Sequence, residues 1–152
     1  MLEGNYFYGE DNIEDAKGIR KLVFIEEQGM PETYQYDEED KESVIVVAYL
    51  DKEPVATGRL LFDGIENLIG RIAVKEQQRG NNYGEFVVRM LIDKCFNYGG
   101  NIVTVIAQER AVDFYKGMGF EISGESYDEY GVNRVPMKLL IRNLVKKCNN
   151  IK

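Results

Sequence analysis

The sequence contains no histidine, two cysteines and no long hydrophobic run, and each scarcity excludes a class of protein or mechanism. Without histidine, no catalytic step can use an imidazole as acid or base. Cys95, in an apolar helical stripe, and Cys148, in a polar tail, do not make a disulfide framework, which favours a reducing cytoplasm. The longest apolar run, residues 44–50, is too short to span a bilayer, and the N-terminus lacks the features of a signal peptide. We expect a soluble, cytoplasmic protein that does not act at a membrane.

Positive charge is also scarce. The 19 lysines and arginines face 26 aspartates and glutamates, which gives a net charge of −7. Nucleic-acid binding needs clustered cations, so it is not expected, and an amine-bearing partner fits the charge better. Five of the acids form one block: Asp37, Glu38, Glu39, Asp40 and Glu42. We expect this block to be a solvated loop, with a substrate-facing rim as the alternative.

Apolar periodicity predicts one α/β domain in this chain of 152 residues. Strands are expected near residues 5–8, 44–50, 55–62, 66–74, 102–107 and 135–141, with another after Phe120, and the strands 44–50 and 55–62 are expected to form an antiparallel hairpin. Helices are expected over residues 13–24, with Asn12 as N-cap and Leu22 in the apolar stripe, over about 84–98 and over 110–117. A further helical turn is expected in the loop of residues 28–40. The strand, helix and strand between residues 66 and 107 form a βαβ unit. The result is a mixed sheet of six to seven strands flanked by about four helices.

The most informative stretch is residues 72–84, IAVKEQQRGNNYG, in which an apolar strand ends at a turn of small residues and a helix follows. The first N–H groups of a helix lack partners within it, and together with the helix dipole they favour a phosphate or pyrophosphate. The turn lacks the Lys-Ser/Thr pair of a P-loop and the G-x-G-x-x-G of a dinucleotide site. The pattern therefore predicts a phosphorylated ligand held by the turn.

These residues resemble the Gcn5-related N-acetyltransferase (GNAT) family. Its acetyl-coenzyme A motif, usually within R-G-x-G-x-G, matches QQRGNNYG at residues 77–84, with Asn82 where the family usually has a glycine. Asparagine tolerates left-handed and capping geometry, so we interpret Asn82 as a substitute N-cap. The family pattern A-x-x-F-Y-x-x-x-G-F matches residues 111–120. The likeness is closest to the ElaA-type branch, through VFIEEQGMPE at residues 23–32 and IGRIAV at residues 69–74.

The resemblance implies a GNAT domain over residues 1–142 followed by a polar tail over 143–152. It implies a splayed sheet that admits acetyl-CoA, the co-substrate, between the strand ending at Val74 and the strand ending at Ala107, and no metal. The implied coenzyme-binding residues are Ile72, Ala73, Val74, Arg79, Gly80, Asn82, Tyr83, Gly84 and Gln108. Tyr115 matches the tyrosine that lies beside the coenzyme sulfur in the family.

Acetyl transfer requires three functions, and the sequence offers candidates for each. Main-chain N–H groups at residues 72–74 can anchor the pantetheine arm and polarise the thioester carbonyl. Tyr115, whose ordinary pKa is about 10, is protonated at neutral pH and can donate to the departing sulfur. A carboxylate must accept a proton from the amine, and five candidates remain open: Glu26, Glu27, Asp37, Asp40 and Glu109. No convincing nucleophile is present, so the predicted reaction is direct attack by an amine.

Each role has a competing explanation. Tyr115 can be a packing residue, Arg79 can pair with Glu76, and Gln108 can cap a turn. The chain as a whole can be a non-catalytic module that senses acyl-CoA, or an O-acetyltransferase, although a hydroxyl acceptor needs a stronger base. The predicted acceptor is a primary amine of a small molecule or peptide.

The charge of the acceptor is open, because Arg59 or Arg134 can bind an acidic group and the acidic block can bind a cation. The acceptor walls are expected from residues 28–40 and 127–134. The edge strands are compatible with a homodimer.

Overall fold

The computed structural model describes residues 1–141, which form eight strands. The described residues divide into two compact units, Met1–Leu61 with Ile69–Asp93, and Phe62–Leu68 with residues 94–141. The expected α/β class is present, with one strand more than the upper end of the prediction. The polar tail over 143–152, including Cys148, lies outside the described residues.

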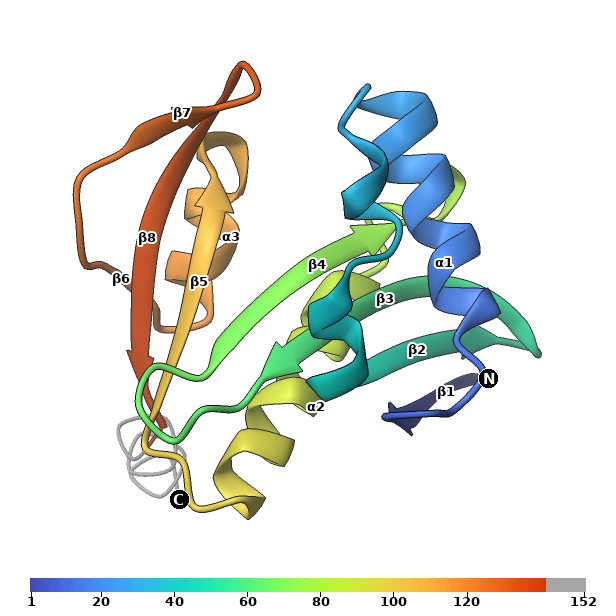
Figure 1. Cartoon of the computed structure of the whole chain (residues 1–152), viewed down its shortest axis with the longest axis horizontal. Coiled ribbons are helices and arrows are strands. Elements are labelled where there is room, and N and C mark those ends of the chain that lie inside the picture. The colour runs from blue at the N-terminus through green and yellow to red at the C-terminus, as the bar shows by residue number, and fades with distance from the viewer. Residues whose placement is uncertain (142–152) are drawn as a thin grey trace. The chain divides into compact units, whose positions relative to one another are not determined.

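The first unit contains four neighbouring strands in the order β1, β2, β3, β4 (Figure 1). They span Leu2–Tyr8, Val44–Leu50, Glu53–Leu61 and Leu68–Val74. β2 and β3 form the predicted antiparallel hairpin. Asp51 and Lys52 both have positive φ values, 49° and 74°, as a two-residue turn of the primed type requires. β1 pairs antiparallel with β2, so the predicted N-terminal strand is confirmed and is longer than expected.

Helices lie on both faces of this first sheet, and two adjacent residues of β3 show why. A Cβ added at Gly58 would meet Val87 and Leu91 of helix α2 (Tyr83–Asn97), so the glycine allows close packing of that helix. Arg59 points the other way and contacts Asp40 of the 3₁₀ turn η3 (Glu38–Glu42). Successive strand side chains alternate between faces. Coverage of both faces explains why the first five residues of β2 are all buried.

The first helix changes its period partway along. Helix α1 (Glu14–Arg20) continues directly into a π-helical segment, η1 (Lys21–Glu27). The wider π-helical turn shifts the apolar stripe, so Val23 and Phe24 are buried but Leu22, predicted to be in the stripe, is 45% exposed. Asn12 accepts a hydrogen bond from the Glu14 N–H (2.9 Å), while the N-cap itself is Ile13. The predicted cap is therefore displaced by one residue.

The loop between η1 and β2 is more regular than its sequence indicates. Its two 3₁₀ segments are η2 (Glu32–Tyr34) and η3. A further 3₁₀ turn in this unit, η4 (Glu76–Gln78), precedes α2. Together with α1 and η1, the loop covers the face of the sheet that carries Arg59.

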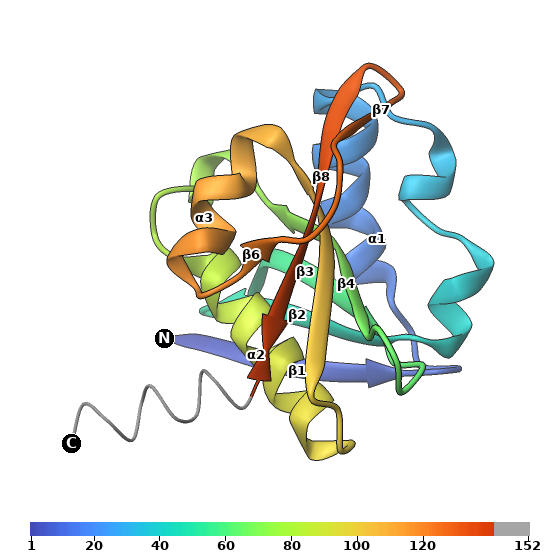
Figure 2. The same ribbon diagram turned by 90° about the vertical axis from the view of Figure 1, so that its left-hand side faces the viewer.

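The second unit is built on the antiparallel pair β5 (Ile102–Gln108) and β8 (Val132–Leu140), with β6 (Glu121–Ile122) and β7 (Tyr127–Glu129) also paired with β8 (Figure 2). β7 was not predicted, and β8 begins three residues earlier than expected because it forms a hairpin with β7. A 3₁₀ turn, η5 (Glu109–Ala111), leads from β5 into the short helix α3 (Val112–Gly117).

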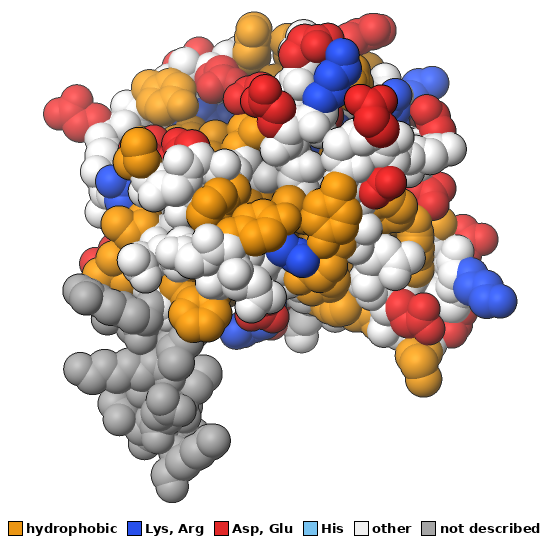
Figure 3. All heavy atoms as spheres, turned by 60° about the horizontal axis from the view of Figure 1, so that its bottom comes forward, with side chains coloured by type: hydrophobic (Ala, Val, Ile, Leu, Met, Phe, Trp, Pro, Cys, Tyr) orange, Lys and Arg blue, Asp and Glu red, His pale blue; other side chains and the backbone are white. Residues whose placement is uncertain are grey.

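The surface is acidic, as the net charge of −7 requires. On the face drawn in Figure 3, acidic side chains are scattered among few basic ones. None of the helices within residues 1–141 has both the length and the apolar character to cross a bilayer.

Candidate active site

The glycine turn, residues 76–84, has the backbone conformation that its sequence predicts. Gly80 has φ 84° and Asn82 has φ 65°, so both adopt the left-handed region. No atom lies within 4 Å of a Cβ added at Gly80, so backbone conformation alone favours glycine there. Asn82 is the last residue before α2, and its carbonyl accepts a hydrogen bond from the Phe86 N–H (3.1 Å). Asn82 thus takes a left-handed position where the motif described above usually has a glycine, and Tyr83 and Gly84 begin the helix.

Arg79 lies in this turn but pairs with a different carboxylate from the one expected. Its Nη1 and Nη2 each donate to a Glu27 carboxylate oxygen at 2.7 Å, and its Nε donates to the Val74 carbonyl at 3.1 Å. The hydrogen bonds that Arg79 donates to Glu27 raise the pKa of Arg79, since they favour the charged guanidinium. The alternative partner, Glu76, is therefore not the hydrogen-bonded one. A diphosphate that binds Arg79 must compete with Glu27 or share the guanidinium with it.

The strand that precedes the turn is irregular at one position. Arg71 has φ 52° in the middle of β4, a conformation that a residue with a Cβ adopts at a cost. Directly after it come Ile72, Ala73 and Val74, the predicted anchors of the pantetheine arm. Ala73 is buried, whereas its two neighbours are half-buried.

Tyr115 lies on α3 and is 6% exposed. Its ring packs edge-to-face against Phe114 (centroids 4.9 Å apart) and Phe120 (5.4 Å). Burial raises the pKa of Tyr115 well above its ordinary value, and the nearby Arg134 guanidinium opposes part of that increase. The hydroxyl therefore stays protonated at neutral pH, as a proton donor must. The ring therefore packs as the competing explanation expected, and the acid role stays a prediction, since one residue can pack with its ring and donate from its hydroxyl.

Gln108 ends β5 at the position expected, opposite Arg134 of β8. Arg134 is 9% exposed, and its Nη1 lies 3.5 Å from the Ile106 carbonyl. Glu109 is exposed and accepts a hydrogen bond from Asn133 Nδ2 at 3.0 Å. The second unit thus brings Tyr115, Gln108 and Arg134 into one neighbourhood around the end of β5.

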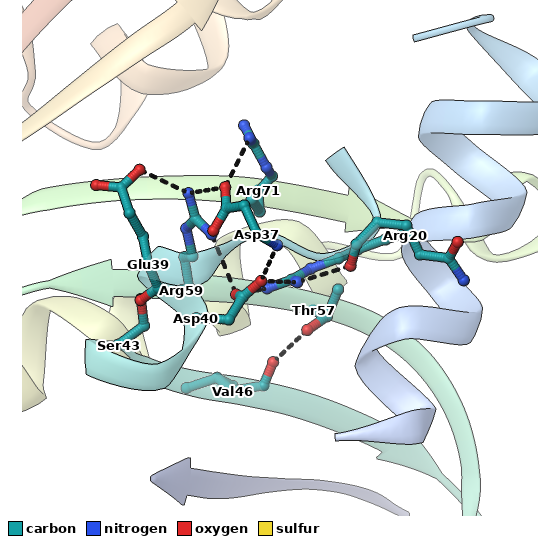
Figure 4. Close-up of polar contacts among 10 residues, drawn as sticks. Arg20, Asp37, Glu39, Asp40, Ser43, Val46, Thr57, Arg59 and Arg71 are labelled. Atoms are coloured by element: carbon teal, nitrogen blue, oxygen red, sulfur yellow. Dashed lines mark hydrogen bonds and ion pairs between the residues drawn. The ribbon is translucent and has the colours of Figure 1, made fainter. Parts of the chain in front are cut away.

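The prediction that the acidic block is a solvated loop is wrong for two of its five residues. The side chains of Asp40 and Asp37 are 1% and 18% exposed, whereas Glu38, Glu39 and Glu42 are exposed as expected. The buried pair contacts three arginines in the arrangement shown in Figure 4. We call the following five residues the buried charge cluster: Arg20, Asp37, Asp40, Arg59 and Arg71.

Two arginines of the buried charge cluster each donate to both carboxylate oxygens of one aspartate. Arg20 donates to both Asp40 oxygens at 3.0 and 3.1 Å. Arg59 donates to both Asp37 oxygens at 2.7 and 3.1 Å and also to Asp40. Burial opposes ionisation of Asp40, but hydrogen bonds and positive charge from Arg20, with help from the Asp37 N–H and Arg59, outweigh it and lower the pKa. Arg59 is therefore occupied by two aspartates and is not available to a ligand.

These contacts reduce the set of candidate bases. Asp37 and Asp40 are held in the buried charge cluster, and Glu27 is held by Arg79. Glu26 and Glu109 remain exposed. The sequence did contain a signal for the cluster, because Arg20 falls on the apolar stripe of its helix and Arg71 interrupts an apolar strand.

Cys95 is buried, as predicted. Burial raises the pKa of its thiol to about 11, so the thiolate is scarce at neutral pH. Among residues 1–141, no three or more Asp, Glu, Cys or His side chains are grouped to hold a metal. A shallow pocket of about 220 Å³ lies in the first unit between residues 9–17 and residues 36–41. Of the candidate residues only Asp40 lines this pocket, and its carboxylate is bound to Arg20, so we do not assign the pocket to catalysis.

Comparison with known proteins supports the resemblance seen in the sequence. Residues 11–141 match the family described as Acetyltransferase (GNAT) domain. An uncharacterized N-acetyltransferase of Bacillus subtilis, YjcF, is 30% identical over 116 residues, which cover 76% of this chain and 83% of that protein. These matches span most of both chains.

Solved structures show the same fold. The crystal structure of Escherichia coli ElaA matches with a TM-score of 0.81 and 26% identity, covering 91% of this chain and 99% of that one. A GNAT family acetyltransferase from Elizabethkingia anophelis, crystallised with acetyl-CoA bound, matches with a TM-score of 0.72 and 15% identity over 91% of this chain and 97% of that one. The glycine turn, the strand before it and the length of these matches lead to one conclusion: the chain belongs to the GNAT acetyltransferase family.

Proposed function

We propose that this protein is an acetyl-CoA-dependent N-acetyltransferase that moves the acetyl group to a primary amine of a small molecule or peptide by direct attack. The observation that carries the proposal is the glycine turn. Left-handed Gly80 and Asn82 lead into the N-terminus of α2, a helix of 15 residues. Such a terminus favours a diphosphate. Family membership and the acetyl-CoA bound to the E. anophelis relative support the same ligand.

In the proposed mechanism, backbone groups hold the co-substrate. The turn from Arg79 to Gly84 binds the diphosphate, and N–H groups at residues 72–74 pair with the pantetheine arm. One of these N–H groups donates to the thioester oxygen and stabilises the negative charge that develops on it. Gln108 contacts the arm through its amide. Acetyl-CoA itself supplies an activated acyl group.

Side chains move the protons. Tyr115 donates its proton to the departing sulfur, and the charge of Arg134 lowers the cost of the tyrosinate that forms. Glu26 or Glu109, directly or through water, accepts the proton of the attacking amine. Direct attack is favoured over an acetyl-enzyme because the buried Cys95 thiol is a poor nucleophile.

The proposal is tested by incubating the protein with acetyl-CoA and a panel of polyamines, amino sugars, amino acids and peptides, and measuring free thiol. Amine-dependent thiol release is expected. Tyr115→Phe should lower kcat by about a hundredfold or more, because general acids contribute on that scale, while the Kd for acetyl-CoA stays unchanged. Unchanged kcat at saturating substrates would exclude Tyr115 as the acid.

A non-catalytic acyl-CoA-binding module is the second candidate. Three of the five candidate bases are held in ion pairs, and the chain has no histidine, which favours this alternative over a catalyst with a strong base. Acetyl-CoA binding without thiol release from any amine in the panel would support the module and contradict the transferase.

A further inference from the structure

The buried charge cluster contains one more cation than anion. Three guanidinium groups, from Arg20, Arg59 and Arg71, face two carboxylates, from Asp37 and Asp40. A further acid, Glu39, lies 3.7 Å from Arg59, but its side chain is 61% exposed. Buried charges are normally paired, so the surplus requires an explanation.

Two of the three arginines make several hydrogen bonds to the carboxylates. Arg20, completely buried, donates to both oxygens of Asp40 and to the Gln35 carbonyl at 3.0 Å, although its Nε is buried without a partner in the described part of the chain. Arg59 donates to both oxygens of Asp37. All four oxygens of the two carboxylates therefore already accept hydrogen bonds from Arg20 or Arg59.

Arg71 is the least satisfied member of the cluster. Within residues 1–141 its guanidinium makes one hydrogen bond, from Nη2 to Asp37 at 3.2 Å, and its Nε is buried without a partner. The group lies 3.9 Å over the ring of Tyr34 and is 20% exposed. Burial and repulsion from Arg59 lower the pKa of Arg71. In Figure 4 its guanidinium projects past Asp37, away from Arg20 and Asp40.

Arg71, with its incompletely hydrogen-bonded guanidinium, lies next to the residues proposed to hold the thioester. It directly precedes residues 72–74, the proposed thioester anchors, and Cα atoms of neighbouring residues are about 3.8 Å apart. Ile72 faces Gly58 on the side of the sheet that α2 covers, whereas Arg71 contacts Asp37 and Tyr34 on the opposite side. Tyr34, against which it stacks, belongs to the loop of residues 28–40, the expected acceptor wall. An acceptor at the thioester would thus have its remaining groups within reach of Arg71.

We propose that Arg71 binds a carboxylate on the acceptor, so that the preferred acceptors are amines that also carry a carboxylate, such as amino acids. This inference rests on the proposed transferase function. A carboxylate supplies the missing negative charge, and its two oxygens match the planar fork of a guanidinium. Tyr34 holds the guanidinium plane in place, so little side-chain freedom is lost on binding.

Pairs of amines that differ only by a carboxylate test the inference: lysine and cadaverine, ornithine and putrescine, β-alanine and ethylamine. The carboxylated member of each pair should have a kcat/KM higher by about tenfold or more, mostly through KM, because a charged hydrogen bond is worth about that factor. Arg71→Gln should abolish this preference and leave the Kd for acetyl-CoA unchanged. Arg89→Gln, which removes an exposed arginine of α2, is the matched control and should keep the preference.

The outcomes separate the two proposals. Thiol release from both members of each pair with equal efficiency would overturn the role of Arg71 and leave the transferase intact. A preference that persists in Arg71→Gln would also overturn it, because a general charge effect would then be responsible. If Arg71→Gln does not fold, Arg71→Lys takes its place: it keeps the positive charge but not the planar fork, so it should reduce the preference, and an unchanged preference would overturn the role of Arg71. Absence of thiol release from every amine, here and in the wider panel, would overturn the transferase itself.

Discussion

Two arginine–carboxylate sites in the first unit have similar geometry and opposite surroundings. In the buried charge cluster, the side chains of Arg20 and Asp40 are 0% and 1% exposed and their ion pair measures 3.0 Å. At the glycine turn, Arg79 and Glu27 are 40% and 29% exposed and their ion pair is shorter, 2.7 Å.

The comparison shows that distance alone does not rank ion pairs. Water and salt weaken the exposed pair, so it contributes little to stability, and a ligand can replace one partner. A buried pair has lost its hydration, so neither partner can leave without stranding a charge. We therefore expect the buried charge cluster to determine whether the chain folds and the glycine turn to determine how it binds.

The largest expected effect is on the unfolding free energy and concerns the buried charge cluster. Asp40→Asn removes the charge that compensates Arg20 and Arg59, and breaking a buried pair in this way costs about 3–5 kcal/mol of unfolding free energy. Urea denaturation followed by circular dichroism measures the loss. Glu42→Gln, a change of an exposed acid in the same 3₁₀ turn, is the control and should have little effect. Equal stability of the two variants would show that burial does not distinguish these sites.

Acid should weaken the buried charge cluster. Because the pKa of Asp40 is lower in the folded chain than in the unfolded one, its ionisation stabilises the fold above the unfolded pKa of about 3.9. That stabilisation is lost as the pH falls through the folded pKa. The unfolding free energy of the parent should therefore decrease below about pH 4 more steeply than that of Asp40→Asn. Parallel pH profiles would contradict the assignment.

A smaller effect is expected at the exposed pair, and it concerns binding. Arg79→Ala should raise the Kd for acetyl-CoA by about tenfold, through loss of charged hydrogen bonds to the diphosphate. Glu27→Gln should lower that Kd by about twofold to fivefold, because the amide no longer competes for the guanidinium. Isothermal titration calorimetry measures both. Weaker binding by Glu27→Gln would show that Glu27 positions Arg79 and does not compete with the coenzyme.

The smallest effect sharpens the description of the glycine turn. Asn82→Gly removes the cost of a left-handed conformation but increases the freedom of the unfolded chain, so stability should change by less than about 1 kcal/mol. The Kd for acetyl-CoA should stay within about twofold if Asn82 fully replaces the usual glycine. Asn81→Gly, at a position without positive φ, is the control. A large gain in affinity in Asn82→Gly alone would identify the asparagine as a defect in the site.

Much of the fold could be predicted from local sequence patterns. Apolar periodicity, and the turn residues between the elements, predict the β2–β3 hairpin, β4, α2 and β5. The observed bounds of these elements agree closely with the predicted ones. The turn geometry at Gly80 and Asn82 also follows from local residue preferences. The failures, such as the exposed Leu22 and the extra strand β7, arise where a helix changes period or where pairing with a distant strand defines the element.

The charged residues were the least predictable, because the sequence gives their number but not their partners. Asp37, Asp40 and Glu27 were equal candidates for a catalytic base until the fold placed an arginine against each. Arg59 was a candidate ligand for the acceptor until the same contacts occupied it.

By itself, the sequence determined the family, the order of most elements and the turn proposed to hold the coenzyme, because these depend on residues that are neighbours in the chain. Only the tertiary structure decided which charges are buried together. Asp40 meets Arg20 across 20 positions, Arg71 meets Asp37 across 34, and Glu27 meets Arg79 across 52. Electrostatic energy depends on distance and burial in space, and neither follows from separation along the chain. For that reason only the folded molecule shows that, among residues 1–141, the guanidinium of Arg71 has hydrogen-bond donors without partners.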